Sequence, residues 1–234
     1  MAVVFDFDGV LVDSVAPVTS SINAALREHG LAARDPAELL RLIGPPTFSA
    51  FSELLGEPPD SPSVAAVVAT YRAHYAAVYL TQTRVFDGVV AMLEGLSAHM
   101  QHQRSDMQQQ GPDMQHRGGL AVATSKSSEF AQPLLDALGL ARFFAVTAAA
   151  DPQTRGDDKF AVLGRALAGL GVSDATMVGD RSFDMQAARA HGLRAVGVSW
   201  GTGDVEELRA AGAEAIADSP AELLALLVDA ASGR

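Results

Sequence analysis

The stretch FDFDGVLVDS at residues 5–14 follows directly on an apolar run and places two aspartates, Asp6 and Asp8, two positions apart. The run AVVF at residues 2–5 predicts a buried strand, where an unpaired charge would be costly. In an extended chain residues two apart point to the same side, so we expect Asp6 and Asp8 to project together beyond the strand. Gly9 allows a sharp turn or the close approach of a ligand. Asp-Gly is also a common turn pair, so this stretch alone leaves a plain turn and a cation site equally open.

The stretch ATMVGDRSFD at residues 175–184 repeats this design near the other end of the chain. Asp180 follows an apolar strand, and Asp184 falls in the first turn of the next helix. Carboxylates that meet at the ends of two strands would repel one another, and their pKa values would rise. A divalent cation removes that conflict, and ligands that are all oxygen favour Mg²⁺. We therefore predict a Mg²⁺ site where the two aspartate pairs meet.

Strand-length apolar runs alternate with helix-length stretches through most of the chain. The expected strands are residues 2–5, 120–124, 143–148, 175–179 and 194–199. The expected helices are residues 90–96, 131–139, 160–170, 183–192 and 204–212. This alternation predicts an α/β fold with a doubly wound, Rossmann-like parallel sheet and helices on both faces. Ligands of such sheets bind at the carboxyl ends of the strands, where both aspartate pairs fall.

The alternation is interrupted between residues 15 and 82, where the sequence predicts helices and no strand. The breakers GPP at 44–46 and EPPDSP at 57–62 divide this stretch into separate helices. We expect an inserted α-helical cap domain at 15–82 and an α/β core built from residues 1–14 and 83–234.

A second irregularity is the stretch at residues 98–119, which is polar and rich in Gln, Met and His. Its histidines, His99, His102 and His116, raise the hypothesis of a metal site in which the methionines serve as soft ligands. Their spacing matches no tight ligand set. We favour a flexible polar insertion at the surface, because a connection of this length is often disordered.

The composition argues against several classes of function. The 234 residues carry a formal net charge of −11, which disfavours nucleic acid and anionic membranes as partners, since both attract basic surfaces. The chain contains no cysteine and therefore no disulfide or thiolate site. It shows neither a secretory leader pattern nor an apolar run of membrane-spanning length, so we expect a cytoplasmic protein. Nothing in the sequence indicates the oligomeric state.

Two further positions are suited to binding phosphate. Thr124 ends an expected strand and precedes Ser125, and hydroxyl and N–H groups at such a turn can hold a phosphate, although helix capping is the commoner role. Lys159 opens an expected helix, where a cation is mildly unfavourable, and it is one of only two lysines among 17 basic residues. A lysine in that position is usually just solvated, but its placement against local preference favours a functional role.

In chain order, the motif DFDGV, a strand ending in Thr124, Lys159 and the motif GDRSFD resemble the haloacid dehalogenase-like hydrolase superfamily. The helical insertion after the first motif agrees with that family. DFDGVLVDS, the insertion and GDRSFD together look like its phosphoglycolate phosphatase-like branch. The resemblance covers the chain except residues 98–119, where the family usually has a short connection. It implies a Mg²⁺-dependent phosphatase with a helical cap, acting on a small phosphorylated metabolite.

The resemblance also implies a role for each motif residue. Asp6 would attack phosphorus to form an aspartyl-phosphate, and Asp8 would serve as general acid and then as general base. Asp6, the backbone carbonyl of Asp8 and Asp180 would hold Mg²⁺, with Asp184 acting through water or orienting the ligands. The phosphate-binding residues would be Gly9, Thr124, Ser125 and Lys159, of which Thr124 and Lys159 would also neutralise the charge that develops during the reaction.

Other activities fit these residues less well. A dehalogenase needs no acid such as Asp8, and phosphonatase chemistry needs a lysine in the cap, where this sequence has none. A phosphosugar mutase uses the same core residues, and a non-catalytic phosphate-binding or Mg²⁺-binding module would keep the same fold. Both stay open as alternatives to the phosphatase.

The cap would choose the leaving group, and the turn GPPTF at residues 44–48 is the place where it could face the core. The candidate contacts are Arg41, Gly44, Pro45, Thr47 and Phe48. An ordinary turn between helices is the alternative for any one of these side chains. Phosphoglycolate, a nucleoside monophosphate, a sugar phosphate and pyrophosphate all stay open as substrates.

Overall fold

A parallel sheet of six strands, in the order β5-β4-β1-β6-β7-β8, forms the centre of the protein. The computed structural model describes residues 1–108, 118–151 and 158–232. The strands are β1 (Ala2–Phe5), β4 (Gly119–Ser127), β5 (Val146–Ala150), β6 (Thr176–Gly179), β7 (Arg194–Val198) and β8 (Ala215–Ala217). The predicted α/β fold with its parallel sheet is confirmed, and β8 alone of these strands was too short for the apolar pattern to indicate.

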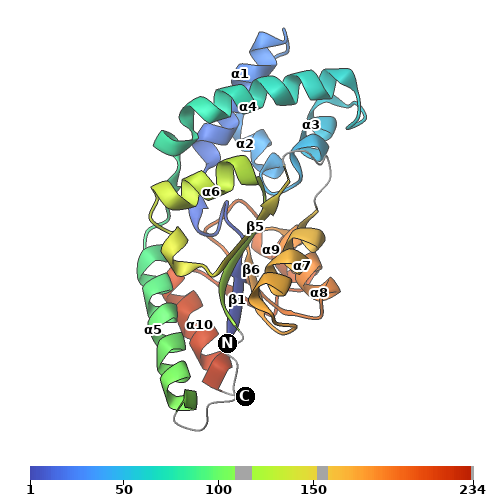
Figure 1. Cartoon of the computed structure of the whole chain (residues 1–234). Helices are drawn as coiled ribbons and strands as arrows, with labels where there is room; N and C mark the ends of the chain where they lie inside the picture. The colour runs from blue at the N-terminus through green and yellow to red at the C-terminus, as the bar shows by residue number, and fades with distance from the viewer. Residues whose placement is uncertain (109–117, 152–157, 233–234) are drawn as a thin grey trace.

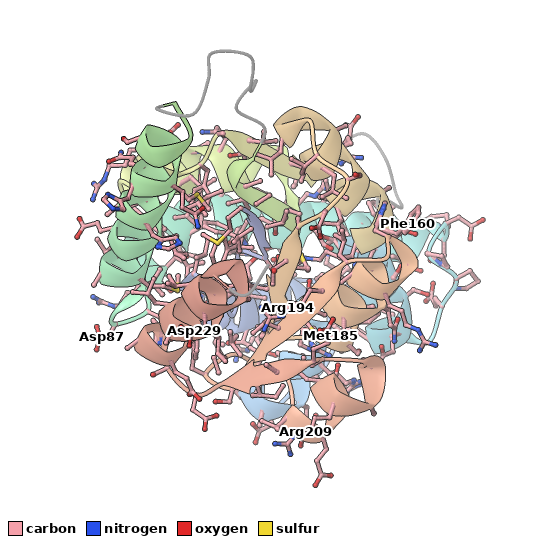
Figure 2. The ribbon with its side chains drawn as sticks, turned by 90° about the horizontal axis from the view of Figure 1, so that it is seen from below. Asp87, Phe160, Met185, Arg194, Arg209 and Asp229 are labelled. Atoms are coloured by element: carbon pink, nitrogen blue, oxygen red, sulfur yellow. The ribbon has the colours of Figure 1, made fainter. Side chains whose placement is uncertain are left out.

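Helices cover both faces of the sheet. Each face is apolar, because alternate side chains of a buried strand such as β1 point to opposite sides. Its neighbours Val3 and Val4 belong to two different apolar clusters. The first face carries α5 (Val89–Gln108), α6 (Ser128–Ala137) and α10 (Pro220–Ser232), and the second carries α7 (Lys159–Leu170), α8 (Ser182–Ala190) and α9 (Val205–Ala211). Figure 1 shows these layers, and Figure 2 shows them from below, with Asp229 of α10 on one side and Phe160 of α7 on the other. Side chains two residues apart point to the same face of a strand, so Asp6, two residues after Val4, points to the face covered by α7 and α8.

Four helices lie between β2 (Val12–Asp13) and β3 (Arg84–Val85), two short antiparallel strands that the sequence pattern did not indicate. They are α1 (Val15–Glu28), α2 (Pro36–Leu39), which continues into the 3-10 turn η1 (Leu40–Leu42), α3 (Thr47–Leu55) and α4 (Pro62–Gln82). We call them the helical unit. It has its own apolar cluster, which Phe130 of α6 joins from the core. The unit sits above the carboxyl ends of the strands (Figure 1).

The polar stretch at residues 98–119 is helical in its first half, which corrects the expectation of a flexible insertion from residue 98 onward. α5 continues to Gln108, and Leu96 and Met100, four residues apart, are both buried on its inner side. Nε2 of His99, on this helix, lies 2.9 Å from the side-chain nitrogen Nε2 of Gln103. Residues 109–117, which include the third histidine of the metal hypothesis, lie outside the described residues.

None of the described helices combines the length and the apolar character that crossing a membrane would require. The 3-10 turn η2 (Ala141–Phe143) completes the elements of the described chain.

Candidate active site

Two neighbouring strands bring the predicted aspartates together at the carboxyl edge of the sheet. Phe5 of β1 pairs with Val178 of β6, and the backbone N–H of Asp6 donates to the carbonyl of Val178 at 2.9 Å, one residue beyond the strand. Asp180 follows β6, and Asp184 lies in the first turn of α8. Ligand oxygens of Asp6, Asp180 and Asp184 all lie within 4.8 Å of one another, and all three residues are buried.

Lys159 forms ion pairs with two of these carboxylates. Its Nζ lies 2.7 Å from Oδ1 of Asp6 and 2.9 Å from Oδ1 of Asp184, and it donates to the carbonyl of Ala123 at 3.1 Å. The lysine is only 5% exposed although it begins a helix, whose N-cap is provided by the side chain of Asp158. Its unfavourable position on α7 is thus explained by the carboxylates that it faces.

The charges of this cluster do not balance. Burial and the neighbouring carboxylates of Asp184 and Asp180 raise the pKa of Asp6 above its usual range, against the opposing effect of Lys159. Burial and Asp184 raise the pKa of Asp180 to about 6, although Thr202 donates two hydrogen bonds to it. Burial alone would lower the pKa of Lys159, but Asp184 and Asp6 outweigh it. Three buried carboxylates therefore face one ammonium.

This residue set fits a divalent cation. All its donors are carboxylate oxygens, the ligands that hard divalent ions prefer. Oδ1 of Asp180 is buried, and no described residue donates a hydrogen bond to it. Such an unpaired charged oxygen is costly unless a cation or another donor meets it. The carboxylate of Asp8 is not part of this group.

Glycines allow other segments to pack directly on the carboxylates. A Cβ on Gly9, whose φ is 81°, would lie 2.0 Å from Oδ2 of Asp180. A Cβ on Gly201 would lie 2.3 Å from Cβ of Asp180, and one on Gly179 would lie 2.2 Å from Cβ of Asp184. Gly9 was expected from its motif, but the segment 201–203 was not, although a Gly-Thr-Gly run after an expected strand is a recognisable signal.

Thr124 and Ser125 lie near the carboxyl end of β4, beside β1; the strand continues to Ser127, three residues beyond its expected end at Thr124. Thr124 is 1% exposed, and its Oγ1 accepts the backbone N–H of Lys126 at 3.1 Å. Oγ of Ser125 is buried without a hydrogen-bond partner among the described residues. Thr124 and Ser125 line the same cavity as Asp6 and Asp8. Four residues from two neighbouring strand ends thus face one space.

Asp8 has a lysine partner of its own, which the sequence motifs did not indicate. Nζ of Lys126 lies 3.0 Å from Oδ2 of Asp8 and 4.8 Å from the centre of the Tyr75 ring. Burial would lower the pKa of Lys126, but the carboxylate of Asp8 and the Tyr75 side chain raise it. Asp6 and Asp8 therefore contact different cations, although they share the cavity. The rarity of lysine in this chain was the signal that could have identified Lys126.

The cavity lies between the sheet edge and the helical unit. Its lining includes Gly44, Pro45 and Thr47 of the predicted turn. Arg41 is not part of the lining: its side chain is about half exposed and pairs with Glu53 at 2.7 Å, so it is not the cavity contact that was expected. Phe48 is not part of the lining either. The centre of its ring lies 6.0 Å from the guanidinium carbon of Arg72.

Arg181, inside the GDRSFD motif, links the core to the helical unit. Its Nη1 donates to the carbonyl of Ile43 and lies 3.5 Å from that of Leu40, and its Nε lies 3.5 Å from Oε1 of Glu207. The residue is 8% exposed. Gly44 packs on it so closely that a Cβ would lie 3.1 Å from Cγ of Arg181. This long-range contact could not be read from the motif itself.

Comparisons with known proteins agree with this geometry. Residues 1–192 match the sequence pattern of the haloacid dehalogenase-like hydrolase family. The chain is 32% identical over 226 residues to a protein named probable phosphatase IndB of Dickeya dadantii, with 95% of this chain and 91% of the relative covered. It is 32% identical over 231 residues to a phosphoglycolate phosphatase of Rhodospirillum rubrum, with 95% of this chain and 88% of the relative covered.

Two further similarities complete the comparison. A protein named tyrosine-protein kinase PtkA of Mycobacterium tuberculosis is 34% identical over 204 residues, but this chain spans only 62% of its length. A crystal structure described as a predicted phosphatase from Clostridium acetobutylicum superposes with a TM-score of 0.85 at 28% identity, and 97% of this chain and 98% of that chain are covered. The predicted resemblance and the fold class are both confirmed.

Proposed function

This chain belongs to the haloacid dehalogenase-like hydrolase family, and on that premise we propose that it is a Mg²⁺-dependent phosphatase of small phosphomonoesters that works through an aspartyl-phosphate. The helical unit would act as its cap. The observation that supports this most strongly is the placement of Asp6 and Asp8. Among the described residues, they are the two carboxylates that line the cavity, whose lining also includes Thr124 and Ser125.

Asp6 is the nucleophile in this proposal. Its Oδ1 accepts the backbone N–H of Phe7 at 2.7 Å and faces Lys159 at the same distance, so the plane of the carboxylate is fixed. A carboxylate oxygen of Asp6 attacks phosphorus, and the bond between phosphorus and the ester oxygen breaks. A fixed nucleophile in this position makes the displacement effectively intramolecular.

Asp8 handles the protons. It donates a proton to the leaving alkoxide as the ester bond breaks, and it then takes a proton from the water that attacks the aspartyl-phosphate. The second step breaks the bond between phosphorus and Asp6 and releases inorganic phosphate and the free carboxylate. Asp6 contacts Lys159 and Asp8 contacts Lys126, so the two carboxylates are positioned by different partners.

Positive charge at the phosphoryl group would come from several sources. A Mg²⁺ ion held by Asp6, Asp180 and the backbone carbonyl of Asp8, with Asp184 beside it, would supply most of it. The hydroxyl of Thr124 and the unpaired Oγ of Ser125 are available to the phosphoryl oxygens. Lys159 holds the carboxylates of Asp6 and Asp184 in place and adds its own charge.

Steady-state hydrolysis of p-nitrophenyl phosphate tests this function. We expect turnover with Mg²⁺, abolition by EDTA with recovery on adding Mg²⁺ back, and loss of turnover in Asp6→Asn. Asp136→Asn, the same change on the exposed side of α6, is the matched control and keeps full activity. Full activity in Asp6→Asn would reject the nucleophile.

The two alternatives predict different products when a sugar phosphate replaces p-nitrophenyl phosphate as the substrate. A phosphosugar mutase transfers the phosphoryl group to a second hydroxyl, so isomerised sugar phosphate forms faster than free phosphate. A binding module binds phosphate esters without turning any of them over. A phosphatase releases inorganic phosphate and the alcohol in equal amounts.

A further inference from the structure

The wall of the cavity that faces Asp6 and Asp8 is apolar. Its aliphatic and aromatic residues include Val18, Ile22, Phe51, Tyr71, Tyr75 and Phe130. Besides the two tyrosines, the polar side chains that the helical unit contributes are Thr47 and Arg72. A leaving group on phosphorus would meet this wall, because the phosphoryl group itself occupies the end at Asp6. Such a surface offers few partners for a sugar or another alcohol with many hydroxyls.

Aromatic rings form a continuous series along this wall. The ring centres of Phe51 and Tyr71 are 5.1 Å apart, and those of Tyr71 and Tyr75 are 5.7 Å apart in a stacked arrangement. Phe130 of the core meets Tyr75 edge-to-face at 5.0 Å. Rings at these separations attract one another and provide a surface on which a further planar ring can stack.

The cations of the lining already have acidic partners. Nζ of Lys126 lies 3.0 Å from Asp8, and Nη1 of Arg72 lies 3.8 Å from Glu129. A carboxylate on the leaving group would bring another negative charge beside the phosphate, and among the described residues of the lining it would find no cation without a partner. That charge would have to displace an existing ion pair or lose its hydration uncompensated.

We propose that this site selects neutral aromatic leaving groups, the phosphate monoesters of benzylic or phenolic alcohols, over phosphorylated hydroxy acids such as phosphoglycolate. The inference rests on the proposed phosphatase function and names the substrate class for the same site. The aromatic ring of the leaving group stacks against Tyr71. Because this leaving group carries no charge, the ion pairs that Lys126 and Arg72 form with their acidic partners stay intact.

Benzyl phosphate and phosphoglycolate are a matched pair for the test, because in both of them the bond that breaks joins phosphorus to a CH₂–O group. The two differ in whether a phenyl ring or a carboxylate is attached, and ethyl phosphate serves as a small neutral reference. We expect kcat/KM for benzyl phosphate to exceed that for phosphoglycolate at least tenfold, about 1.4 kcal/mol in transition-state binding.

A variant separates recognition by the wall from the reactivity of the ester. Tyr71→Leu keeps an apolar side chain but removes the ring, and we expect the ratio of kcat/KM for benzyl to that for ethyl phosphate to fall at least fivefold. Tyr79→Leu, on the same helix but outside the lining, is the control and keeps the wild-type ratio. Circular dichroism of both variants verifies that they fold.

The outcomes distinguish this inference from the function on which it rests. Phosphoglycolate hydrolysed as well as or better than benzyl phosphate overturns the inference and leaves the phosphatase intact. An unchanged benzyl-to-ethyl ratio in a folded Tyr71→Leu also overturns it. No hydrolysis of the three esters, together with none of p-nitrophenyl phosphate, rejects the phosphatase itself.

Discussion

Gly9 and Asp180 are packed in direct contact, so that a Cβ on Gly9 would lie 2.0 Å from a carboxylate oxygen of Asp180. The contact joins the first aspartate motif to the second and leaves no room for any side chain at this position. Gly9 also has a φ of 81°, which residues with a Cβ rarely adopt. The geometry of the carboxylate cluster therefore depends on a residue that has no side chain.

Gly9→Ala should abolish most of the activity. The added methyl group displaces Asp180, and a displacement of about 1 Å in a catalytic group can cost about 100-fold in rate. We expect kcat to fall by about that factor and the Mg²⁺ concentration for half-maximal activity to rise. The control is Gly30→Ala, which has a similar φ of 72° but nothing within 4 Å of the added Cβ. Gly30→Ala should lose some stability and keep its kcat.

Lys159→Met should impair both catalysis and stability. It leaves the buried carboxylates of Asp6 and Asp184 without their cation, and removing one partner of a buried ion pair typically costs about 3–5 kcal/mol. Chemical denaturation without metal should show a loss of that order, and hydrolysis should fall by about 100-fold or more. Arg142→Met, which removes an exposed pair with Glu94, serves as the comparison and should change stability by less than about 1 kcal/mol. Equal effects of the two changes would argue against the buried network.

The stabilisation that Mg²⁺ gives should grow with pH. Because burial raises the pKa of Asp180 from 3.8 to about 6, the folded protein without metal holds its proton more tightly than the unfolded chain does. This contribution to stability is fully present below pH 4 and is lost as the pH rises through about 6. Metal binding requires the ionised carboxylates, so it releases protons and is favoured at higher pH. The increase in Tm on adding Mg²⁺ should be larger at pH 8 than at pH 5, and the opposite trend would contradict the carboxylate site.

Arg181→Met should weaken the binding of substrate more than it slows the chemical step. The change removes the hydrogen bond from the motif GDRSFD to the carbonyl of Ile43 and leaves the turn beside the cavity without its anchor in the core. We expect KM to rise by a larger factor than kcat falls. Arg209→Met on the exposed side of α9 controls for the loss of a positive charge. A fall in kcat with an unchanged KM would show that Arg181 acts on the carboxylates and not on the helical unit.

The sequence predicted the sheet and its carboxylate edge because both depend on local patterns. Apolar runs of strand length indicated β1 and β6, and a charge directly after each run indicated where Asp6 and Asp180 would fall. β8 was missed because three residues, AIA, give no alternation to detect. The helical character of 98–108 was missed because polar residues dominate that part of α5, although Met100 packs into the core.

The partners across the site could not be predicted in the same way. Lys126 and Lys159 are far apart in the sequence, and only the fold decides that one meets Asp8 and the other Asp6. Tyr71 was seen as part of a helix, but α4 is apolar on several sides, so the sequence did not say which side faces the cavity. Gly44, Pro45 and Thr47 line the cavity, whereas Arg41 pairs with Glu53 and Phe48 lies outside the lining.

The central claim is that Asp6 carries the phosphoryl group, and chemical trapping tests it most directly. Protein quenched with acid during turnover of p-nitrophenyl phosphate is treated with borohydride, which reduces an acyl phosphate, and its peptides are then analysed by mass spectrometry. The account predicts that aspartate is reduced at position 6 in the wild type and in Asp136→Asn, and that no reduced peptide forms without substrate. Reduction at Asp8 instead, or unmodified Asp6 in protein that is turning over, would contradict it.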